Sequence, residues 1–78
     1  MKAKVNAAEK DKVLQSFGDN LRKLREQKEL TQEALAFMAG FSRSYYTEVE
    51  QGKRNLSLLN ISRLANALEI PMSNLLMF

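Results

Sequence analysis

Two short helical segments separated by a tight turn constrain this chain more than any other feature of its sequence. Thr31 is a residue type that commonly caps a helix N-terminus, and strong helix formers follow it as far as Gly40. Glycine readily adopts the left-handed conformation at which many helices end. Two residues later, Ser42 can cap a second helix over residues 43–51, which Gly52 ends. Two short helices joined by a glycine-containing turn form a helix-turn-helix motif.

The segment before this motif carries an apolar stripe at helical spacing. Its members recur at i, i+4, i+8 and i+11: Val13, Phe17, Leu21 and Leu24. Either Asn6 or Ser16 can cap this first helix, because an acidic residue follows each of them three positions later. We expect residues 1–12 to be a partly ordered N-terminal extension and residues 13–78 to form one domain.

The segment after the motif predicts two further helices. Ser57 can cap a fourth helix that ends before Pro71, since a residue preceding proline avoids the helical region. Pro71 can open a short final helix over residues 72–77. Strand signals are nearly absent from the sequence. The predicted fold class is therefore all-α, a compact five-helix bundle.

Composition narrows the possible functions. A 78-residue chain has room for one modest core, and a domain of this size benefits from a partner such as a second copy. The chain contains neither histidine nor cysteine, which removes the usual general base and the commonest zinc ligands. We therefore expect no enzyme activity, no metal or other cofactor and no small-molecule substrate. No apolar run is long enough to span a membrane and no signal peptide is evident, so we expect a cytoplasmic protein without membrane contact.

Charge is unevenly distributed along the chain, whose formal net charge is +3. Residues 1–28 carry eight cations against four acids, residues 29–52 carry one against four, and residues 53–78 carry three against one. A DNA-binding surface would therefore take its cations from the first segment and from the Lys53-Arg54 pair. Ordinary solvated helix faces would explain the charge alone equally well.

Three signatures at fixed spacing resemble a known family. They are Leu30-Thr-Gln-Glu-Ala-Leu-Ala, Ala39-Gly, and Ser42-Arg-Ser-Tyr-Tyr-Thr-Glu-Val-Glu-Gln-Gly-Lys. Together they resemble the lambda-repressor-like (xenobiotic-response-element) helix-turn-helix family over residues 16–76. The later stretch Gly52-Lys-Arg-Asn-Leu-Ser-Leu-Leu-Asn-Ile is similar to controller proteins of bacterial restriction–modification systems. This resemblance implies a homodimer that binds a palindromic DNA operator, regulates transcription and controls its own promoter. A phage-type repressor and a helix-turn-helix module that binds proteins are the alternatives.

Two positions depart from the family pattern. Glu29 stands where the family usually has glycine or asparagine, so a positive φ there would cost about 1 kcal/mol. Without a positive φ, the first helix would end differently from the family. Tyr46 stands where the family usually has a core isoleucine or valine, and a buried tyrosine needs a partner for its hydroxyl.

The exposed face of the helix after Ser42 is the predicted DNA-reading surface. Arg43, Ser44, Thr47 and Glu48 lie at i, i+1, i+4 and i+5, opposite the core-facing side of that helix. Arginine can pair with guanine O6 and N7, and glutamate can accept from cytosine N4. Serine and threonine can donate or accept, and the threonine methyl can contact that of thymine. The resemblance independently implies base contacts here.

Three further groups of residues complete the predicted sites. The candidates for DNA-backbone contacts are Gln32, Ser42, Gln51, Lys53, Arg54 and Asn55. For Gln32 the resemblance implies contacts with both a phosphate and the helix after Ser42. The resemblance implies a structural ion pair between Arg25 and Glu50. Tyr45 could reach a phosphate or pack against the fourth helix, and we interpret it as a packing residue. The apolar C-terminus predicts a dimer interface, although some of its residues could belong to the chain's own core. The predicted interface residues are Ile70, Met72, Leu75, Leu76 and Phe78, and the resemblance implies dimerisation through the fifth helix and the neighbouring fourth helix. The predicted core contains Phe17, Leu21, Leu24, Leu35, Val49, Leu56 and Leu64.

Overall fold

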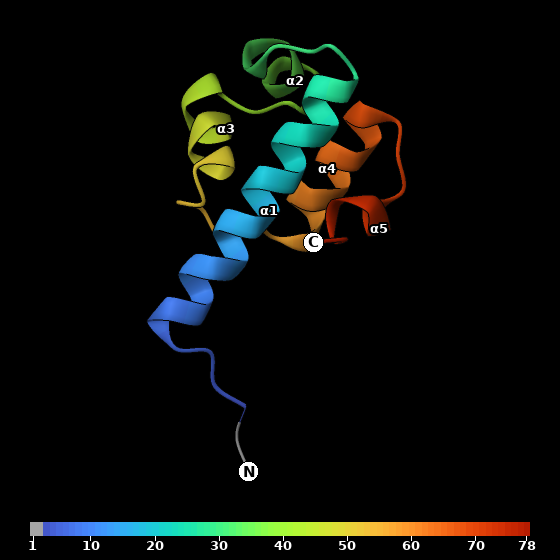
Figure 1. Cartoon of the computed structure of the whole chain (residues 1–78). Helices are drawn as coiled ribbons and strands as arrows, with labels where there is room; N and C mark the ends of the chain where they lie inside the picture. The colour runs from blue at the N-terminus through green and yellow to red at the C-terminus, as the bar shows by residue number, and fades with distance from the viewer. Residues whose placement is uncertain (1–2) are drawn as a thin grey trace.

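The computed structural model describes residues 3–78, and all of its regular structure is helical. The helices are α1 (Ala7–Gln27), α2 (Gln32–Ala39), α3 (Arg43–Glu50), α4 (Leu58–Leu68) and α5 (Met72–Leu75). The C-terminal part of the long helix α1 runs through the middle of the bundle, and its first turns project beyond the other helices (Figure 1). The predicted all-α fold with five helices is confirmed. Within residues 3–78, no helix combines the length and apolarity needed to cross a membrane.

Three helices begin at the serine or threonine caps that the sequence predicts. The hydroxyls of Thr31, Ser42 and Ser57 each accept a hydrogen bond from the backbone N–H three residues later, at 3.0–3.1 Å. Gly40 ends α2 with a φ of 79°. Each of these bonds satisfies a backbone donor that the helix itself leaves free. The turn from α2 to α3 therefore has the predicted residues in the predicted roles.

Helix α1 begins earlier than its apolar stripe, within the segment expected to be an extension. The side-chain oxygen of Asn6 accepts from the backbone N–H of Glu9 at 2.8 Å, so Asn6 is the cap and Ser16 lies inside the helix. The stripe prediction was wrong at Val13, whose exposed fraction is 51%. Residues 1–2 of the predicted extension lie outside the described residues. Helix α5 ends at Leu75, two residues earlier than expected.

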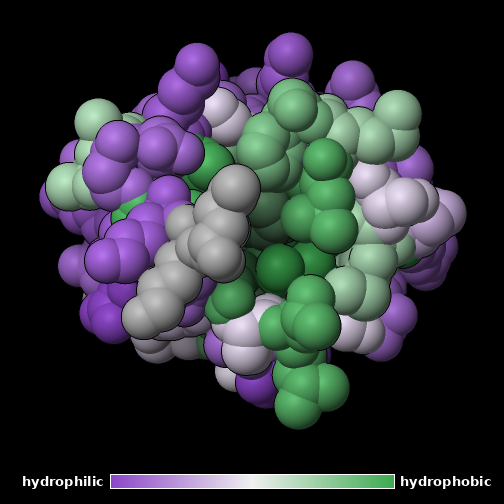
Figure 2. Space-filling model, turned by 90° about the horizontal axis from the view of Figure 1, so that it is seen from below, coloured by the Kyte–Doolittle hydropathy of each residue, from purple (hydrophilic) through white to green (hydrophobic). Residues whose placement is uncertain are grey.

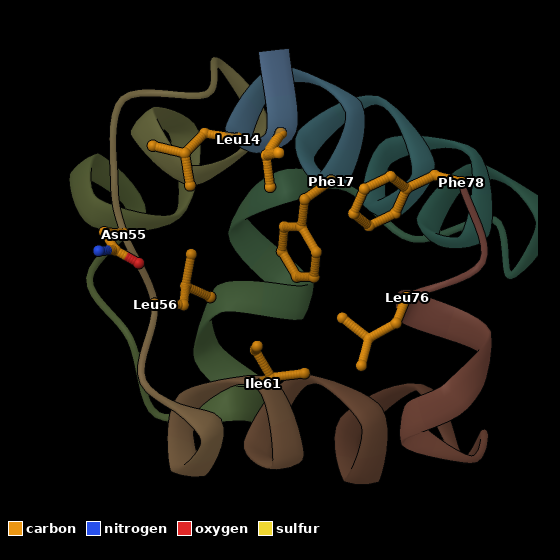
Figure 3. Close-up of a pocket in the computed structure, with 8 residues that line it drawn as sticks. Leu14, Phe17, Asn55, Leu56, Ile61, Leu76 and Phe78 are labelled. Atoms are coloured by element: carbon orange, nitrogen blue, oxygen red, sulfur yellow. The ribbon is translucent and has the colours of Figure 1, made fainter. Parts of the chain in front are cut away.

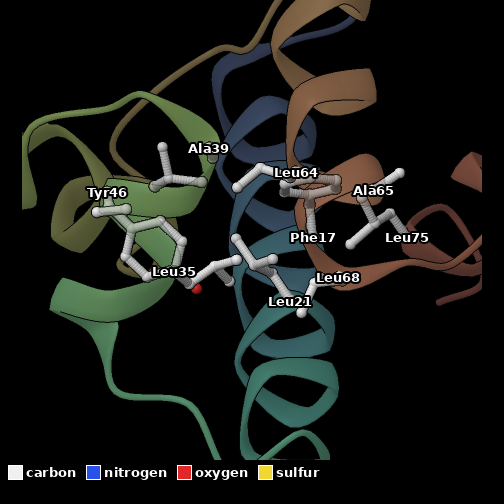
Figure 4. Close-up of a cluster of buried hydrophobic side chains, with 11 residues drawn as sticks. Phe17, Leu21, Leu35, Ala39, Tyr46, Leu64, Ala65, Leu68 and Leu75 are labelled. Atoms are coloured by element: carbon white, nitrogen blue, oxygen red, sulfur yellow. The ribbon is translucent and has the colours of Figure 1, made fainter.

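All five helices contribute side chains to the core (Figure 4). Its fully buried large side chains include a tyrosine among the aliphatic residues. Leu24 and Leu56, predicted for the core, are half-buried and pack against its edge. The buried apolar residues are Phe17, Leu21, Leu35, Ala36, Ala39, Tyr46, Val49, Leu64, Ala65, Leu68 and Leu75.

A glycine inside α1 allows α3 to approach closely. A Cβ atom at Gly18 would lie 2.8 Å from the backbone oxygen of Val49 and nearer still to that of Glu50. Real Cβ atoms do not approach backbone atoms this closely, so any larger residue would displace α3. Gly18 thereby fixes the depth at which α3 sits in the fold.

Two glutamates occupy backbone positions that usually favour glycine. Glu29 follows α1 with a φ of 57°, and Glu69 ends α4 with a φ of 56°. The positive φ at Glu29 resolves the alternatives for the first turn, because the chain keeps the family's left-handed conformation without glycine. Each non-glycine residue in this conformation costs about 1 kcal/mol.

Candidate nucleic-acid interface

The four predicted base-reading residues lie together on the exposed side of α3. They line one polar groove of about 420 Å³ with two of the predicted backbone-contact residues. The complete lining is Gln32, Arg43, Ser44, Thr47, Glu48 and Gln51. The structure therefore brings the start of α2 and the exposed face of α3 to a single concave surface.

Arg43, the first residue of α3, is the one cation among the residues that line this groove. Its side chain is 67% exposed, and its nearest acidic partner, Glu33 of α2, lies 3.9 Å away with 77% exposure. An exposed pair at this distance contributes little stability. The guanidinium is therefore free to exchange Glu33 for another hydrogen-bonding partner in the groove.

Glu48 is not a free acid at this surface. The Nε atom of Arg54 donates to its carboxylate at 2.7 Å, and both side chains are about half exposed. The Arg54 guanidinium also lies 5.5 Å from the ring centre of Tyr45. The sequence predicted a base contact for Glu48 and a backbone contact for Arg54, but it did not predict their pairing. The pair offsets negative charge beside the groove.

Tyr45 is fixed by packing, as predicted from the sequence. Its ring centre lies 5.0 Å from that of Phe41, and its hydroxyl accepts from the Asn60 amide at 3.3 Å. These contacts connect α3 to the preceding turn and to α4. The half-buried tyrosine packs against the edge of the core and supports α3 there.

Beneath the groove lies the ion pair that the resemblance implies. Nε and Nη2 of Arg25 lie 2.7 Å and 3.2 Å from the two carboxylate oxygens of Glu50. The Arg25 side chain is 11% exposed and that of Glu50 is 4% exposed. Arg25 also donates to the backbone oxygen of Leu30 at 2.8 Å. The pair thereby joins α1, the turn after it, and the last residue of α3.

Two more donors complete the surroundings of the Glu50 carboxylate. The Tyr46 hydroxyl donates to one oxygen, and the Gln32 amide donates to the other at 2.9 Å. Burial opposes the charge of Glu50, but the donors from Arg25, Tyr46 and Gln32 outweigh it and hold its pKa below the ordinary value. Burial and the bond to Glu50 raise the pKa of Tyr46. The hydroxyl of the buried tyrosine thus has the partner that the sequence required.

Gln32 connects this buried charge to the groove. Its Nε2 atom donates to Glu50, and its Oε1 atom accepts from the Thr47 hydroxyl at 3.2 Å. The resemblance implied that Gln32 contacts the helix after Ser42 as well as a phosphate, but it did not identify Thr47 as the partner. Their 15-residue separation gives no local signal, because only the crossing of α2 and α3 brings the side chains together.

The remaining predicted backbone-contact residues do not form one cluster. The Ser42 hydroxyl caps α3, while Gln51 lines the groove and Lys53 is exposed in the loop after α3. Asn55 lies outside the groove, at the edge of a separate apolar hollow (Figure 3). The groove and the Lys53 loop therefore hold the accessible polar groups of the motif.

The apolar hollow lies on the underside of the bundle, where Figure 2 shows apolar side chains gathered around a depression. Its volume is about 140 Å³, and Phe17 and Phe78 meet edge to face with ring centres 6.3 Å apart. Helices α1 and α4 and the C-terminus contribute to it. It is lined by Val13, Leu14, Phe17, Asn55, Leu56, Ile61, Leu76 and Phe78.

The predicted dimer-interface residues divide into three groups by exposure. Leu76 and Phe78 are 48% and 56% exposed, whereas Ile70 and Met72 are half-buried against the core. The prediction was wrong for Leu75, which is fully buried by its own chain and offers no surface to a partner. Met77 in the same C-terminal segment is also exposed, as are Leu58 and Leu59 of α4.

Comparison with known proteins agrees with this arrangement. Residues 21–75 match the HTH_3 family, described as helix-turn-helix. The chain is 43% identical to the control protein C.MunI of Mycoplasma sp over 76% of its own length and 81% of that protein. It is 40% identical to the control protein C.BamHI of Bacillus amyloliquefaciens, over 80% and 78% of the two chains.

A solved structure extends the same likeness to three dimensions. The restriction-modification controller protein C.AhdI from Aeromonas hydrophila superposes with a TM-score of 0.78 at 53% identity. The match covers 80% of this chain and 94% of that protein. These relatives are named as control proteins and none is named as an enzyme.

Proposed function

The chain belongs to the HTH_3 helix-turn-helix family, and from this premise we propose that it is a sequence-specific DNA-binding regulator of transcription, acting as the controller protein of a restriction–modification system. The observation that carries the proposal is the polar groove on α3, at whose edge Arg43 is both exposed and weakly paired. A recognition helix reads bases with side chains at its exposed N-terminal end.

Base reading is assigned to the exposed residues of α3. Arg43 has the planar donor set that fits guanine O6 and N7 in the major groove. Ser44 and Thr47 add neutral polar groups on the same face. Glu48, held by Arg54, is the weaker candidate, because a contact with cytosine would require this 2.7 Å ion pair to share the carboxylate.

Backbone contacts are assigned to the ends of the motif. The start of α2, capped by Thr31, presents free N–H groups and a partial positive charge to a phosphate. Lys53 and Gln51 extend from the other end of α3. Such contacts set the orientation of the protein on the duplex and leave sequence selection to the groove.

We assign dimerisation to the apolar underside of the bundle. An isologous dimer covers the same patch on both copies, and Leu76 and Phe78 are exposed at the rim of the hollow there. The first turns of α1 project from this side and would flank a partner seated on it (Figure 1). A two-fold dimer would present two copies of α3 to half-sites about one helical turn apart, which implies a palindromic operator.

The relatives' designation as control proteins supports an operator in the chain's own promoter region. The test is selection of bound duplexes from a randomised DNA pool, followed by titration of the selected site and of the promoter DNA at several salt concentrations. We expect a palindromic consensus that recurs upstream of the chain's own gene. Affinity should fall steeply with salt, because phosphate contacts release counterions. A bound pool with no common sequence, or an affinity for DNA that does not change with salt, would contradict the proposal and favour a module that binds proteins.

A further inference from the structure

The buried charge of Glu50 sets the direction of a chain of hydrogen bonds. An ionised carboxylate accepts hydrogen bonds and cannot donate them. Three side chains, those of Arg25, Tyr46 and Gln32, donate to its two oxygens. Gln32 must therefore turn its Nε2 group towards Glu50, since its amide oxygen would meet the carboxylate with like charge. The opposite orientation of this amide is excluded by the ion pair beneath it.

The fixed amide determines the role of the next side chain. With Nε2 on Glu50, the Oε1 atom of Gln32 faces Thr47 and can only accept. The Thr47 hydroxyl therefore donates its single hydrogen to Gln32, across 3.2 Å. What Thr47 presents to the polar groove from this oxygen is a lone pair, without a hydrogen.

We propose that Thr47 reads DNA as a hydrogen-bond acceptor, contacting an exocyclic amino group of adenine or cytosine, and that Glu50 sets this polarity through Gln32. The inference rests on the proposed function, because it assigns a chemical preference within the same groove. In the major groove, adenine N6 and cytosine N4 donate, whereas purine N7, guanine O6 and thymine O4 accept. A Thr47 oxygen without a free hydrogen can therefore pair only with the donors, adenine N6 or cytosine N4.

Functional-group substitution in the selected operator separates the two polarities. Each adenine or cytosine is replaced in turn by its analogue without the amino group, and each purine by its 7-deaza analogue. At one position of each half-site, we expect loss of the amino group to weaken binding about fivefold, as for one neutral hydrogen bond. The 7-deaza substitution of the purine in that base pair, the adenine itself or the guanine opposite a contacted cytosine, should have no effect.

Two variants connect this position to Thr47. Thr47→Val keeps the shape of the side chain but has no oxygen, so it should bind the natural operator about fivefold more weakly and be indifferent to the missing amino group. Thr47→Ser keeps the hydroxyl and its bond to Gln32, so it should keep the sensitivity of the unmodified protein. Thermal melting of each variant checks that the fold is retained.

The outcomes separate this inference from the proposed function. If the protein selects an operator but 7-deaza substitution, rather than amino-group loss, weakens binding at the Thr47-dependent position, Thr47 donates and the acceptor assignment is overturned. The acceptor assignment is also overturned if Thr47→Val binds every analogue with the same affinity as the unmodified protein. If the protein binds all sequences alike, the proposed function fails, and the assignment to Thr47 fails with it.

Discussion

At the scale of single residues, Glu50 connects the core to the proposed DNA-reading surface. Its carboxylate receives donors from α1, α2 and its own helix, and its side chain is only 4% exposed. Removing one partner of a buried pair leaves the other charge without compensation. Stability and recognition therefore depend on the same side chain.

We expect Glu50→Gln to lower the free energy of unfolding by about 3–5 kcal/mol, because Arg25 would keep a buried charge without its carboxylate partner. Urea denaturation followed by circular dichroism measures the change. Glu26→Gln, an exposed position on α1, is the matched control and should change stability by less than about 0.5 kcal/mol. Equal stability of the two variants would contradict a structural role for the pair.

The same carboxylate predicts an acid dependence of stability. The pKa of Glu50 is lower in the folded chain than its ordinary value of 4.5. Its contribution is therefore fully present above pH 4.5 and is lost as the pH falls from there through the folded pKa. Denaturation at a series of pH values should show a smaller acid-induced loss in Glu50→Gln than in the unmodified chain. If stability changes with pH in the same way in both proteins, Glu50 has the same pKa in the folded and unfolded chain, which would contradict this prediction.

Residue pairings were only partly predictable from the sequence. The exposed position of Arg43 follows from helical spacing, and the pair of Arg25 with Glu50 was implied by the family resemblance. The pairing of Glu48 with Arg54 was not predicted, and the resemblance implied a contact of Gln32 with α3 without naming Thr47 as the partner. These contacts depend on side-chain rotamers and on the crossing of helices, which periodicity does not encode.

At the scale of helices, the ends were more predictable than the distances between helices. Caps such as Thr31, Ser42 and Ser57 act on a backbone group three residues away, so a local sequence pattern determines them. The start of α1 was left open because two local patterns matched equally well. The close approach of α1 to α3 was missed, although a glycine inside a helix is a signal that could have indicated it.

Gly18→Ala tests the close approach of α1 to α3, because the sign of its effect on stability depends on whether the two helices are in contact there. In an uncrowded helix, alanine in place of glycine stabilises by about 1 kcal/mol. Here the added Cβ would lie 2.8 Å from the Val49 oxygen, so we expect a loss of about 1–3 kcal/mol from overpacking. Thermal unfolding measures the change. A stabilised variant would show that α1 and α3 are not in contact at this glycine.

At the strained turn after α1, by contrast, we expect a substitution to stabilise the chain. Glu29→Gly should raise the free energy of unfolding by about 1 kcal/mol, because glycine adopts a φ of 57° without steric cost. Glu26→Gly, inside α1, should lower it by about 1 kcal/mol. Denaturant titration of the two variants compares the positions directly. Destabilisation by both would contradict the left-handed conformation at Glu29.

At the scale of the whole molecule, the polar groove and the apolar underside are separate surfaces with separate proposed partners. The sequence predicted an apolar C-terminal interface but could not separate buried from exposed members. Leu75 completes the core, whereas Leu76 and Phe78, close by in the chain, reach the surface. That division depends on how α5 docks on α1 and α4, which is a property of the assembled bundle.

Phe78→Glu tests the proposed dimer face. The Phe78 ring lines the apolar hollow, so replacing it with a charge should weaken self-association about tenfold or more, as loss of a buried aromatic anchor does. Sedimentation equilibrium over a range of concentrations measures the dissociation constant. The control is Phe37→Glu, on α2, whose side chain is 84% exposed and lies outside this hollow. Unchanged association in Phe78→Glu, or an equal loss in both variants, would contradict the assignment.

The central claim, that the exposed face of α3 reads DNA sequence, is tested most directly by the operator affinity of Arg43→Ala. Fluorescence anisotropy should show a loss of about 1–3 kcal/mol on the selected operator, with relaxed preference at one base pair of each half-site. Lys23→Ala, which removes an exposed cation from α1, should retain the preference at every position. Operator affinity and sequence preference unchanged in Arg43→Ala would contradict the claim.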